Sequence, residues 1–211
     1  MNNNAKDFFE KMAKSDKLAP NSVKLAKNSD FSEIDTAFIR KYTNKDSVVL
    51  DLGSGTGLII NKLYPYVKKI VAVEPFKQFT QYIANSDNIH IDNCDTASFS
   101  SSEKFDAILL FAIMHYVDES EAASIYKKYS NYLKKNGKII IKNQFGIHED
   151  VTVNGFSEEL QENYFAQYRQ IDKEARLLQK VGFTKIEIVD IYPPKCNRWE
   201  NTHFYALVAG K

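Results

Sequence analysis

The stretch Val48-Val49-Leu50-Asp51-Leu52-Gly53-Ser54-Gly55-Thr56-Gly57 decides the fold of this 211-residue chain. Its first three residues are apolar, two of them β-branched, and predict the start of a buried strand. The three alternating glycines permit positive φ angles and a close approach of the backbone to a ligand. The apolar residues that follow keep helical spacing and predict a helix after the turn: Leu58, Ile59, Leu63 and Tyr64.

A strand, a glycine turn and a helix N-terminus together suit a cofactor that contains adenosine. The second predicted strand, residues 70–74, ends in an acid, Glu74, which lies about 20 residues beyond Gly53. This spacing places a carboxylate at the tip of the neighbouring strand, where it can accept both ribose hydroxyls. A solvated strand end is the alternative interpretation of Glu74.

Composition and charge exclude several classes of protein. A hydrophobic content of 44% is ordinary for a globular chain, and this length favours one domain with a substantial core. The net charge of +1 and the scattered basic residues give no footprint for nucleic acid. The longest apolar run, residues 107–114, is too short to span a bilayer, and the first residues lack an apolar signal core.

Cysteine usage points to a reducing compartment. The chain has two cysteines, Cys94 and Cys196, which provide neither a disulfide framework nor a metal cluster. We therefore expect a soluble cytoplasmic protein without a membrane or nucleic-acid partner. The sequence does not predict its oligomeric state.

Strand and helix patterns alternate along most of the chain and predict a mostly parallel sheet with helices on both faces. The last two strands are close in sequence, which predicts a hairpin and one antiparallel strand. Residues 145–156 are expected to form a loop. The predicted strands are residues 48–52, 70–74, 89–93, 105–111, 138–142, 185–189 and 203–208.

Two helical predictions come from capping signals. Asp118 and Glu121 form a pair typical of a capping box and open a helix that should run through Leu133, until the Asn-Gly pair at 136–137. A second, longer helix is predicted over residues 157–182, with Ser157 at its N-cap and Gly182 after its end. Its apolar face would hold Leu160, Tyr164, Tyr168, Ile171, Ala175 and Leu178.

Residues 1–42 are expected to form a helical cap that precedes a core of residues 43–211. Two apolar patches support this prediction, one around Phe8 and one around Phe38, with breaks at Pro20 and near 28–30. Such a cap either covers the sheet or closes over a site as a lid.

Polar residues follow the predicted strands at the edge where open α/β sheets bind ligands. They come after five successive strands: Asp51, Glu74, Asp95, His115 and Asn143. Each has a structural alternative. Asp51 could cap a helix, Asp95 could be a turn aspartate, and His115 could be a half-buried histidine without a chemical role.

As an ordered set, these motifs resemble the class I S-adenosylmethionine-dependent methyltransferases, in the branch that acts on small molecules. The resemblance covers roughly residues 35–210 and is carried by residues 51–57, Glu74, Asp95, 105–117 and 133–137. It implies a Rossmann-like three-layer α/β sandwich whose seven-stranded sheet has its last strand antiparallel.

The resemblance also implies a cofactor, S-adenosyl-L-methionine, and its product, S-adenosyl-L-homocysteine. Residues 51–57 would surround the methionine moiety, Glu74 the ribose and Asp95 the adenine amine. The implied cofactor-binding residues are Asp51, Gly53, Ser54, Gly55, Gly57, Glu74, Pro75, Asp95, Thr96 and Phe111.

The cofactor carries the reactive methyl group, so the protein must align the acceptor and exclude water. A hydroxyl acceptor benefits from a general base, for which His115 is the first candidate and His203 the second. Residues 111–115 would line the methyl-transfer site. The candidate substrate-binding residues are Tyr116, Asn143, Gln144, Arg198 and Trp199.

Two related patterns do not match this chain. Metal-dependent relatives use an Asp, Asp, Asn set, but no acid stands at Phe111 or Ala112 and Asn143 matches loosely, so we predict no metal. The Asn-Pro-Pro-Tyr pattern of enzymes that methylate amines on nucleic acids and proteins is replaced at residues 111–114 by Phe-Ala-Ile-Met. A small-molecule acceptor is therefore favoured.

Residues 142–169 and 191–211 are similar to methyltransferases of bacterial surface-polysaccharide synthesis, which act on sugars or phosphoramidate groups. Arg198 beside the site suits a phosphate or carboxylate on the acceptor, although it could instead stack on Trp199. Three alternatives stay open: N- or O-methylation of another metabolite, a nicotinamide-dependent oxidoreductase, and a non-catalytic cofactor-binding protein. Against the oxidoreductase, Leu58 stands where the dinucleotide pattern requires glycine.

Overall fold

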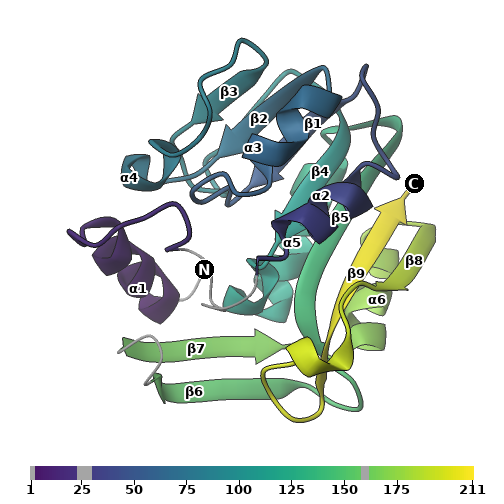
Figure 1. Ribbon diagram of the computed structural model, residues 1–211. Coiled ribbons are helices and arrows are strands. Elements are labelled where there is room, and N and C mark those ends of the chain that lie inside the picture. Colours follow the sequence, from purple (N-terminus) through teal and green to yellow (C-terminus); the bar gives the residue numbers. More distant parts are fainter. Residues whose placement is uncertain (1–2, 23–29, 158–161) are drawn as a thin grey trace. The chain divides into compact units, whose positions relative to one another are not determined.

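Seven strands hydrogen-bond in the order β3-β2-β1-β4-β5-β9-β8 in the computed structural model, which describes residues 3–22, 30–157 and 162–211 (Figure 1). β1 pairs in parallel with β2, and β2 with β3, whereas β9 is antiparallel to β5 and β8. The predicted seven-stranded, mostly parallel sheet is confirmed. Its strands are β1 (Val48–Leu52), β2 (Lys69–Val73), β3 (Ile89–Asp92), β4 (Phe105–Phe111), β5 (Leu133–Gly146), β8 (Lys185–Asp190) and β9 (Thr202–Gly210).

The chain divides into two compact units. The glycine-loop unit comprises Lys11–Leu109 and Tyr132–Lys138, and the hairpin unit comprises Met1–Glu10, Leu110–Asn131 and Ile139–Lys211. The hairpin unit takes its name from a separate two-stranded antiparallel sheet, β6 (Val151–Ser157) with β7 (Glu162–Tyr168) (Figure 1).

Strand register in the glycine-loop unit places the ends of three strands together. Every residue of β1 is buried, as its apolar sequence predicts. Leu52 pairs with Val73, and Val73 pairs with Asp92. The residues that follow β1, β2 and β3 therefore lie at one edge of the sheet, which positions Gly53 next to Glu74.

Helices occupy much less of the chain than predicted near the N-terminus. Residues 14–22 form turns between α1 and α2, and residues 23–29 lie outside the described part of the chain. The α-helices are α1 (Asn3–Ala13), α2 (Ser32–Ile39), α3 (Ile60–Leu63), α4 (Lys77–Thr80), α5 (Glu119–Ser130) and α6 (Ile171–Lys180). Short 3-10 helices are η1 (Tyr64–Tyr66), η2 (Met114–Tyr116) and η3 (Pro194–Cys196).

The loop predicted over 145–156 and the helix predicted over 157–182 are both wrong. Strands β6 and β7 occupy most of this region, and α6 begins only at Ile171, with Gln170 as its N-cap. The four-residue spacing of Tyr164 and Tyr168 fits a helix, but it also fits the two-residue period of a strand. The buried pair Ala166 and Tyr168 shows that the strand period holds. Leu160 lies outside the described residues.

The helix opened by Asp118 ends earlier than predicted. The Asp118 carboxylate accepts from the Glu121 N–H at 2.8 Å, so the predicted cap is confirmed. The helix stops at Ser130, and Leu133 already belongs to β5. Gly137 does not end a helix: a Cβ there would lie 2.7 Å from the Phe105 carbonyl oxygen, so this glycine allows two backbones to approach closely.

A small apolar cluster holds the start of α1 against the two-stranded sheet. Ala5, Tyr116, Ala166 and Tyr168 are buried together, and Phe9 packs edge-on to Tyr116 with ring centroids 5.5 Å apart. The turn η2, which follows β4, and the β6–β7 hairpin thus pack in one core within the hairpin unit.

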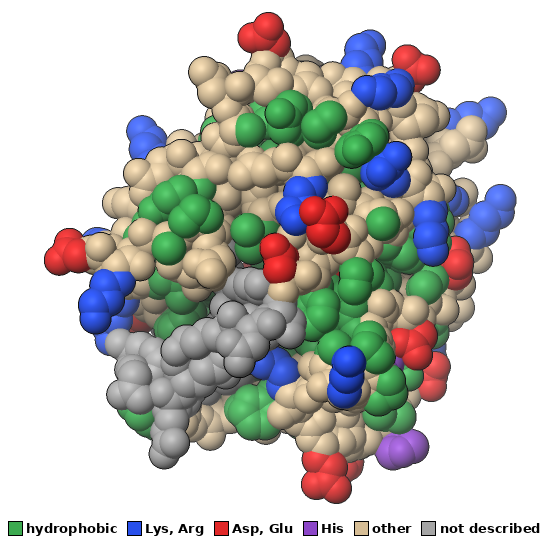
Figure 2. All heavy atoms as spheres, in the orientation of Figure 1, with side chains coloured by type: hydrophobic (Ala, Val, Ile, Leu, Met, Phe, Trp, Pro, Cys, Tyr) green, Lys and Arg blue, Asp and Glu red, His purple; other side chains and the backbone are tan. Residues whose placement is uncertain are grey.

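The surface carries mixed charge, and the described helices are short or polar. Acidic and basic side chains intermingle over the face shown in Figure 2, in keeping with the net charge of +1. Among the described helices, none combines the length and apolar character needed to cross a bilayer.

We expect Gly137→Ala to destabilise the protein, because the new methyl group would clash with the Phe105 carbonyl in a closely packed pair of strands. The free energy of unfolding, measured by urea denaturation, should fall by about 1–3 kcal/mol. Gly155→Ala is the control, since a Cβ at Gly155 meets nothing within 4 Å. Equal stability of the two variants would contradict the close approach.

Candidate functional site

The glycine turn is held in a conformation that other residues adopt at a cost. Gly53, Gly55 and Gly57 have φ angles of 70°, 53° and 76°. The N–H groups of Gly53 and Ser54 donate to the Val73 carbonyl at 2.8 and 3.1 Å. The turn is therefore fixed to the end of β2.

The Glu74 side chain stabilises the glycine turn by a hydrogen bond. Its buried carboxylate accepts from the Gly55 N–H at 2.9 Å through Oε2 and from the Phe76 N–H at 3.1 Å through Oε1. Burial raises the pKa of Glu74 to about 7, although these two donors act in the opposite direction. A carboxylate has about four acceptor positions, so both oxygens can still receive further hydrogen bonds.

Asp51 is a second buried carboxyl group at this edge. Burial, with a smaller effect of the Glu74 charge, raises its pKa to about 7. The Ser54 hydroxyl is also buried, and it forms no hydrogen bond with any residue that the structure describes. Two carboxyl groups and an unsatisfied hydroxyl fit a ligand that is rich in hydroxyl groups and carries positive charge.

The other predicted cofactor-binding residues lie at or beyond strand ends, and all but Phe111 are more exposed. Pro75 is exposed, and Thr96 is half-buried. The exposed Asp95 accepts from the Ser98 N–H at 2.7 Å, which is the turn role given above as its alternative. Phe111, at the end of β4, is buried in the hairpin unit, with the Lys142 ammonium 5.1 Å from its ring centroid.

A strained residue re-directs the chain after β4. Ala112 has φ 58°, a left-handed conformation that is rare for a residue with a side chain, and its N–H donates to the Lys142 carbonyl at 2.8 Å. The sharp bend leads directly into η2, the turn that carries His115. No sequence signal marks Ala112 for this role.

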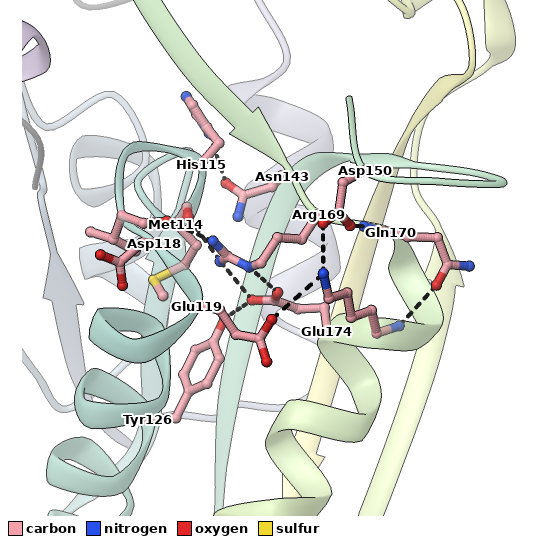
Figure 3. Close-up of polar contacts among 12 residues, drawn as sticks. Met114, His115, Asp118, Glu119, Tyr126, Asn143, Asp150, Arg169, Gln170 and Glu174 are labelled. Atoms are coloured by element: carbon pink, nitrogen blue, oxygen red, sulfur yellow. Dashed lines mark hydrogen bonds and ion pairs between the residues drawn. The ribbon is translucent and has the colours of Figure 1, made fainter. Parts of the chain in front are cut away.

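His115 is a buried imidazole with one nitrogen engaged. Its Nδ1 lies 3.3 Å from the Asn143 Oδ1, so Nδ1 carries the proton and donates to Asn143. Its Nε2 is buried and has no hydrogen-bond partner within the described chain. Figure 3 shows the ring with Asn143 at one nitrogen and the other nitrogen pointing away.

The surroundings of His115 keep it neutral. Burial lowers the pKa of His115 to about 3, while the hydrogen bond to Asn143 partly opposes this decrease. Three positive charges also lower it, from Arg169, Arg198 and Lys142. The Nε2 lone pair is therefore available at neutral pH, in an environment that favours negative charge.

Gln144 of β5 lies against the loop between η3 and β9, which carries Arg198 and Trp199. With its oxygen towards this loop, the Gln144 amide accepts from the N–H groups of Arg198 and Trp199 at 3.0 and 3.3 Å. The Trp199 indole N–H donates to the Tyr168 hydroxyl at 3.2 Å. Gln144 thus shapes the loop, and half-buried Arg198 and exposed Trp199 keep accessible surface.

His203 differs from His115 because both of its nitrogens have partners. Nδ1 lies 2.9 Å from the Asn197 Oδ1, and Nε2 lies 2.7 Å from the Asp190 Oδ1. This geometry favours His115 over His203 as the group that receives a proton.

A buried ion pair beside His115 was not predicted from the sequence. Arg169 and Glu174 are 3% and 0% exposed, and Glu174 also accepts a hydrogen bond from the Tyr126 hydroxyl (Figure 3). The one available signal was the scarcity of arginine, which this chain has at only four positions. Within the described residues, no group of three or more His, Cys, Asp or Glu side chains could hold a metal ion.

Comparisons with known proteins agree with this geometry. Residues 49–137 match the family described as "Methyltransferase domain". The chain is thus similar to S-adenosylmethionine-dependent methyltransferases, as one of the solved structures is named. The expected cofactor is the one named with such structures, and the unsatisfied Ser54 hydroxyl and the buried carboxyl groups fit it.

Individual relatives are distant. An uncharacterized methyltransferase of Anoxybacillus flavithermus (strain DSM 21510 / WK1) is 30% identical over 96 residues, 44% of this chain. The match spans about half the length of that relative, 45%. Two solved structures share the fold. A Burkholderia thailandensis 1,6-didemethyltoxoflavin-N1-methyltransferase has a TM-score of 0.73, 15% identity, and coverage of 97% of this chain and 85% of that one. A DhpI-SAM-HEP complex has a TM-score of 0.70, 14% identity and full coverage of both chains.

From the raised pKa values of Asp51 and Glu74, we predict that S-adenosylhomocysteine binds more weakly as the pH falls from 8 to 6. Both pKa values lie near 7, and the ionised carboxylates are the stronger acceptors, so binding must release protons at low pH. Calorimetry at pH 6, 7 and 8 should find that the Kd of S-adenosylhomocysteine is about three to ten times higher at pH 6 than at pH 8.

Buffers of different ionisation enthalpy should reveal the accompanying proton release. Glu74→Gln should weaken binding and flatten the pH dependence, whereas Asp46→Asn, at an exposed site, should leave both unchanged. A wild-type affinity that is constant between pH 6 and 8 would contradict the ionisation of these carboxyl groups on binding.

Proposed function

We propose that the protein transfers the methyl group of S-adenosylmethionine to an oxygen atom of an anionic small molecule. The observation that carries this proposal is His115, a buried neutral imidazole whose Nε2 lacks a partner among the described residues. Positive charge from three side chains acts on it, which favours an acceptor that brings negative charge.

The cofactor, when bound, supplies a methyl group that its sulfonium makes electrophilic. In our proposal Glu74 accepts hydrogen bonds from the ribose hydroxyls, and Asp51 and Ser54 contact the methionine portion at the glycine turn. Asp95 accepts from the adenine amine. Pro75, Thr96 and Phe111 would provide further contacts.

His115 would hold the acceptor hydroxyl at Nε2 and receive its proton, while Asn143 fixes the tautomer through Nδ1. A histidine with a pKa of about 3 is a weak base by itself. An anionic acceptor nearby would offset the three cations and raise that pKa. Catalytic competence would thus depend on the charge of the acceptor.

Arg198 would bind the anionic group of the acceptor. Its side chain is half-buried on a loop whose backbone Gln144 holds by two hydrogen bonds, so the start of the side chain has a defined position. Trp199 and Tyr116 would pack against the apolar part of the acceptor.

We propose a sugar or a phosphoramidate or phosphorylated precursor of a bacterial capsule or surface polysaccharide as this acceptor. The support is the resemblance to enzymes of that synthesis expected from the sequence of residues 142–169 and 191–211, together with the positive charges around His115. An alternative is N- or O-methylation of another metabolite, because the Burkholderia neighbour is named an N1-methyltransferase. Nicotinamide-dependent oxidation has no comparable support.

Residues 1–42 would act as a lid on a single 43–211 core. In the glycine-loop unit, the Thr56 hydroxyl donates to the Pro20 carbonyl, and the Tyr82 hydroxyl donates to the Leu18 carbonyl at 2.7 Å. These contacts link the segment after α1 to the glycine turn. A cytoplasmic location, without nucleic-acid or membrane partners, completes the proposal.

His115→Ala should lower kcat by about 100-fold or more with little change in the Kd of S-adenosylhomocysteine, because a proton acceptor is lost while the glycine turn is untouched. The measurement is S-adenosylhomocysteine release with a panel of phosphorylated sugars and matched neutral sugars. His148→Ala is the control, since His148 is exposed. A wild-type kcat in His115→Ala would remove His115 from the mechanism, and no turnover with any acceptor would contradict the proposed activity.

Arg198→Ala should raise KM for the phosphorylated acceptor about tenfold or more and leave kcat within a few-fold, because an anion clamp acts on substrate and transition state alike. Arg176→Ala, which removes an exposed arginine on α6, should change neither constant. An unchanged KM in Arg198→Ala would contradict the anion-binding role.

A further inference from the structure

One side chain, that of Arg169, hydrogen-bonds to the backbone on both sides of His115. The Arg169 guanidinium donates to the Met114 carbonyl at 2.9 Å and to the Val117 carbonyl at 2.6 Å. These two carbonyl groups flank His115 in sequence. The backbone on either side of the imidazole is therefore fixed by the same planar group (Figure 3).

The guanidinium is itself held in one pose. Its Nε lies 2.5 Å from the Glu174 Oε2, and one of its terminal nitrogens lies 3.0 Å from the Oε1. The Tyr126 hydroxyl donates to the same Oε1. Burial disfavours the charge of Arg169, but the hydrogen bonds and charge of Glu174 raise its pKa above the ordinary value.

Arg169 joins three elements of the hairpin unit through its backbone and its side chain. The residue directly follows β7, and its carbonyl accepts from the Gly146 N–H at the end of β5 at 3.0 Å. Its neighbour Tyr168 has a ring 5.4 Å from the His115 ring. One residue thus fixes the end of the hairpin and the turn that carries His115.

The stability that an ion pair contributes does not by itself explain why Arg169 and Glu174 are buried here. A buried ion pair is often no more stabilising than apolar side chains of similar volume, because both charges lose their hydration. Arginine does offer a rigid fork that satisfies a carboxylate and two carbonyl groups together, which the single ammonium of lysine cannot do in the same geometry.

We infer that Arg169 is a positioning residue, which sets the place of the His115 ring by binding the carbonyl groups of Met114 and Val117, with Glu174 and Tyr126 holding the guanidinium. The inference rests on the proposed function, in which His115 receives the proton of the acceptor. It assigns catalytic importance to a residue that the proposed function does not place in contact with cofactor or acceptor.

Arg169→Lys tests the inference, because it keeps a cation opposite Glu174 and loses the fork. Arg176→Lys on the exposed side of α6 is the matched control. We expect Arg169→Lys to lower kcat at least tenfold, with KM and the Kd of S-adenosylhomocysteine within threefold of wild type, at a temperature well below its Tm. A wild-type kcat there, or a change confined to KM, would overturn the inference.

Histidine-labelled NMR gives a readout that does not need turnover. The His115 ring signal is assigned by its loss in His115→Gln, and we expect it to shift and titrate at higher pH in Arg169→Lys as the ring becomes hydrated. Lys142 and Asn143 from β5, Tyr168 from β7 and Arg198 remain around the ring in this variant. The control should retain the wild-type signal.

Tyr126→Phe keeps the buried charges of Arg169 and Glu174, and it is the second test variant if Arg169→Lys does not fold. It should shift the His115 signal in the same direction, by less. An unchanged His115 signal in the folded variants would overturn the positioning role. If wild-type protein turns over no acceptor but the signal shifts as expected, the proposed function fails and the structural part of the inference stands.

Discussion

The hydrogen bond from the Gly55 N–H to the buried Glu74 carboxylate is the contact on which the glycine-loop unit depends. It links the turn after β1 to the residue after β2, across strands whose register is set by apolar pairing. The cost is a carboxyl group with a pKa near 7. A buried acid is retained where its ionised form has a use, and in the proposed function that use is to bind the cofactor.

Local patterns predicted this part of the molecule well. The apolar run before Gly53 and the acid at Glu74 lie in one continuous segment, so spacing alone places them at neighbouring strand tips. The antiparallel final strand followed from the short connection to β9. The pairing of His115 with Asn143 could be expected only as proximity, because the tautomer depends on atoms that are distant in sequence.

The features that the sequence did not predict share a physical cause. The segment before α6 has a spacing of aromatic residues that satisfies both helix and strand periods, and only packing against Tyr116 and Ala5 selects the strand. The left-handed Ala112 and the buried Arg169 are likewise set by tertiary contacts. Neither residue type carries a local signal for such a role, whereas glycine does at Gly53, Gly55 and Gly57.

The pairing of β6 only with β7 has a consequence for how such a chain can change. Because this two-stranded sheet is not part of the seven-stranded one, replacing its residues alters no strand register there. β6 and β7 lie in the chain between β5 and Arg169, and Ala166 and Tyr168 of β7 pack in the core that contains Tyr116. In the proposed function, a change of residues in this hairpin would therefore act on the surroundings of His115 and leave the residues of the glycine turn unchanged.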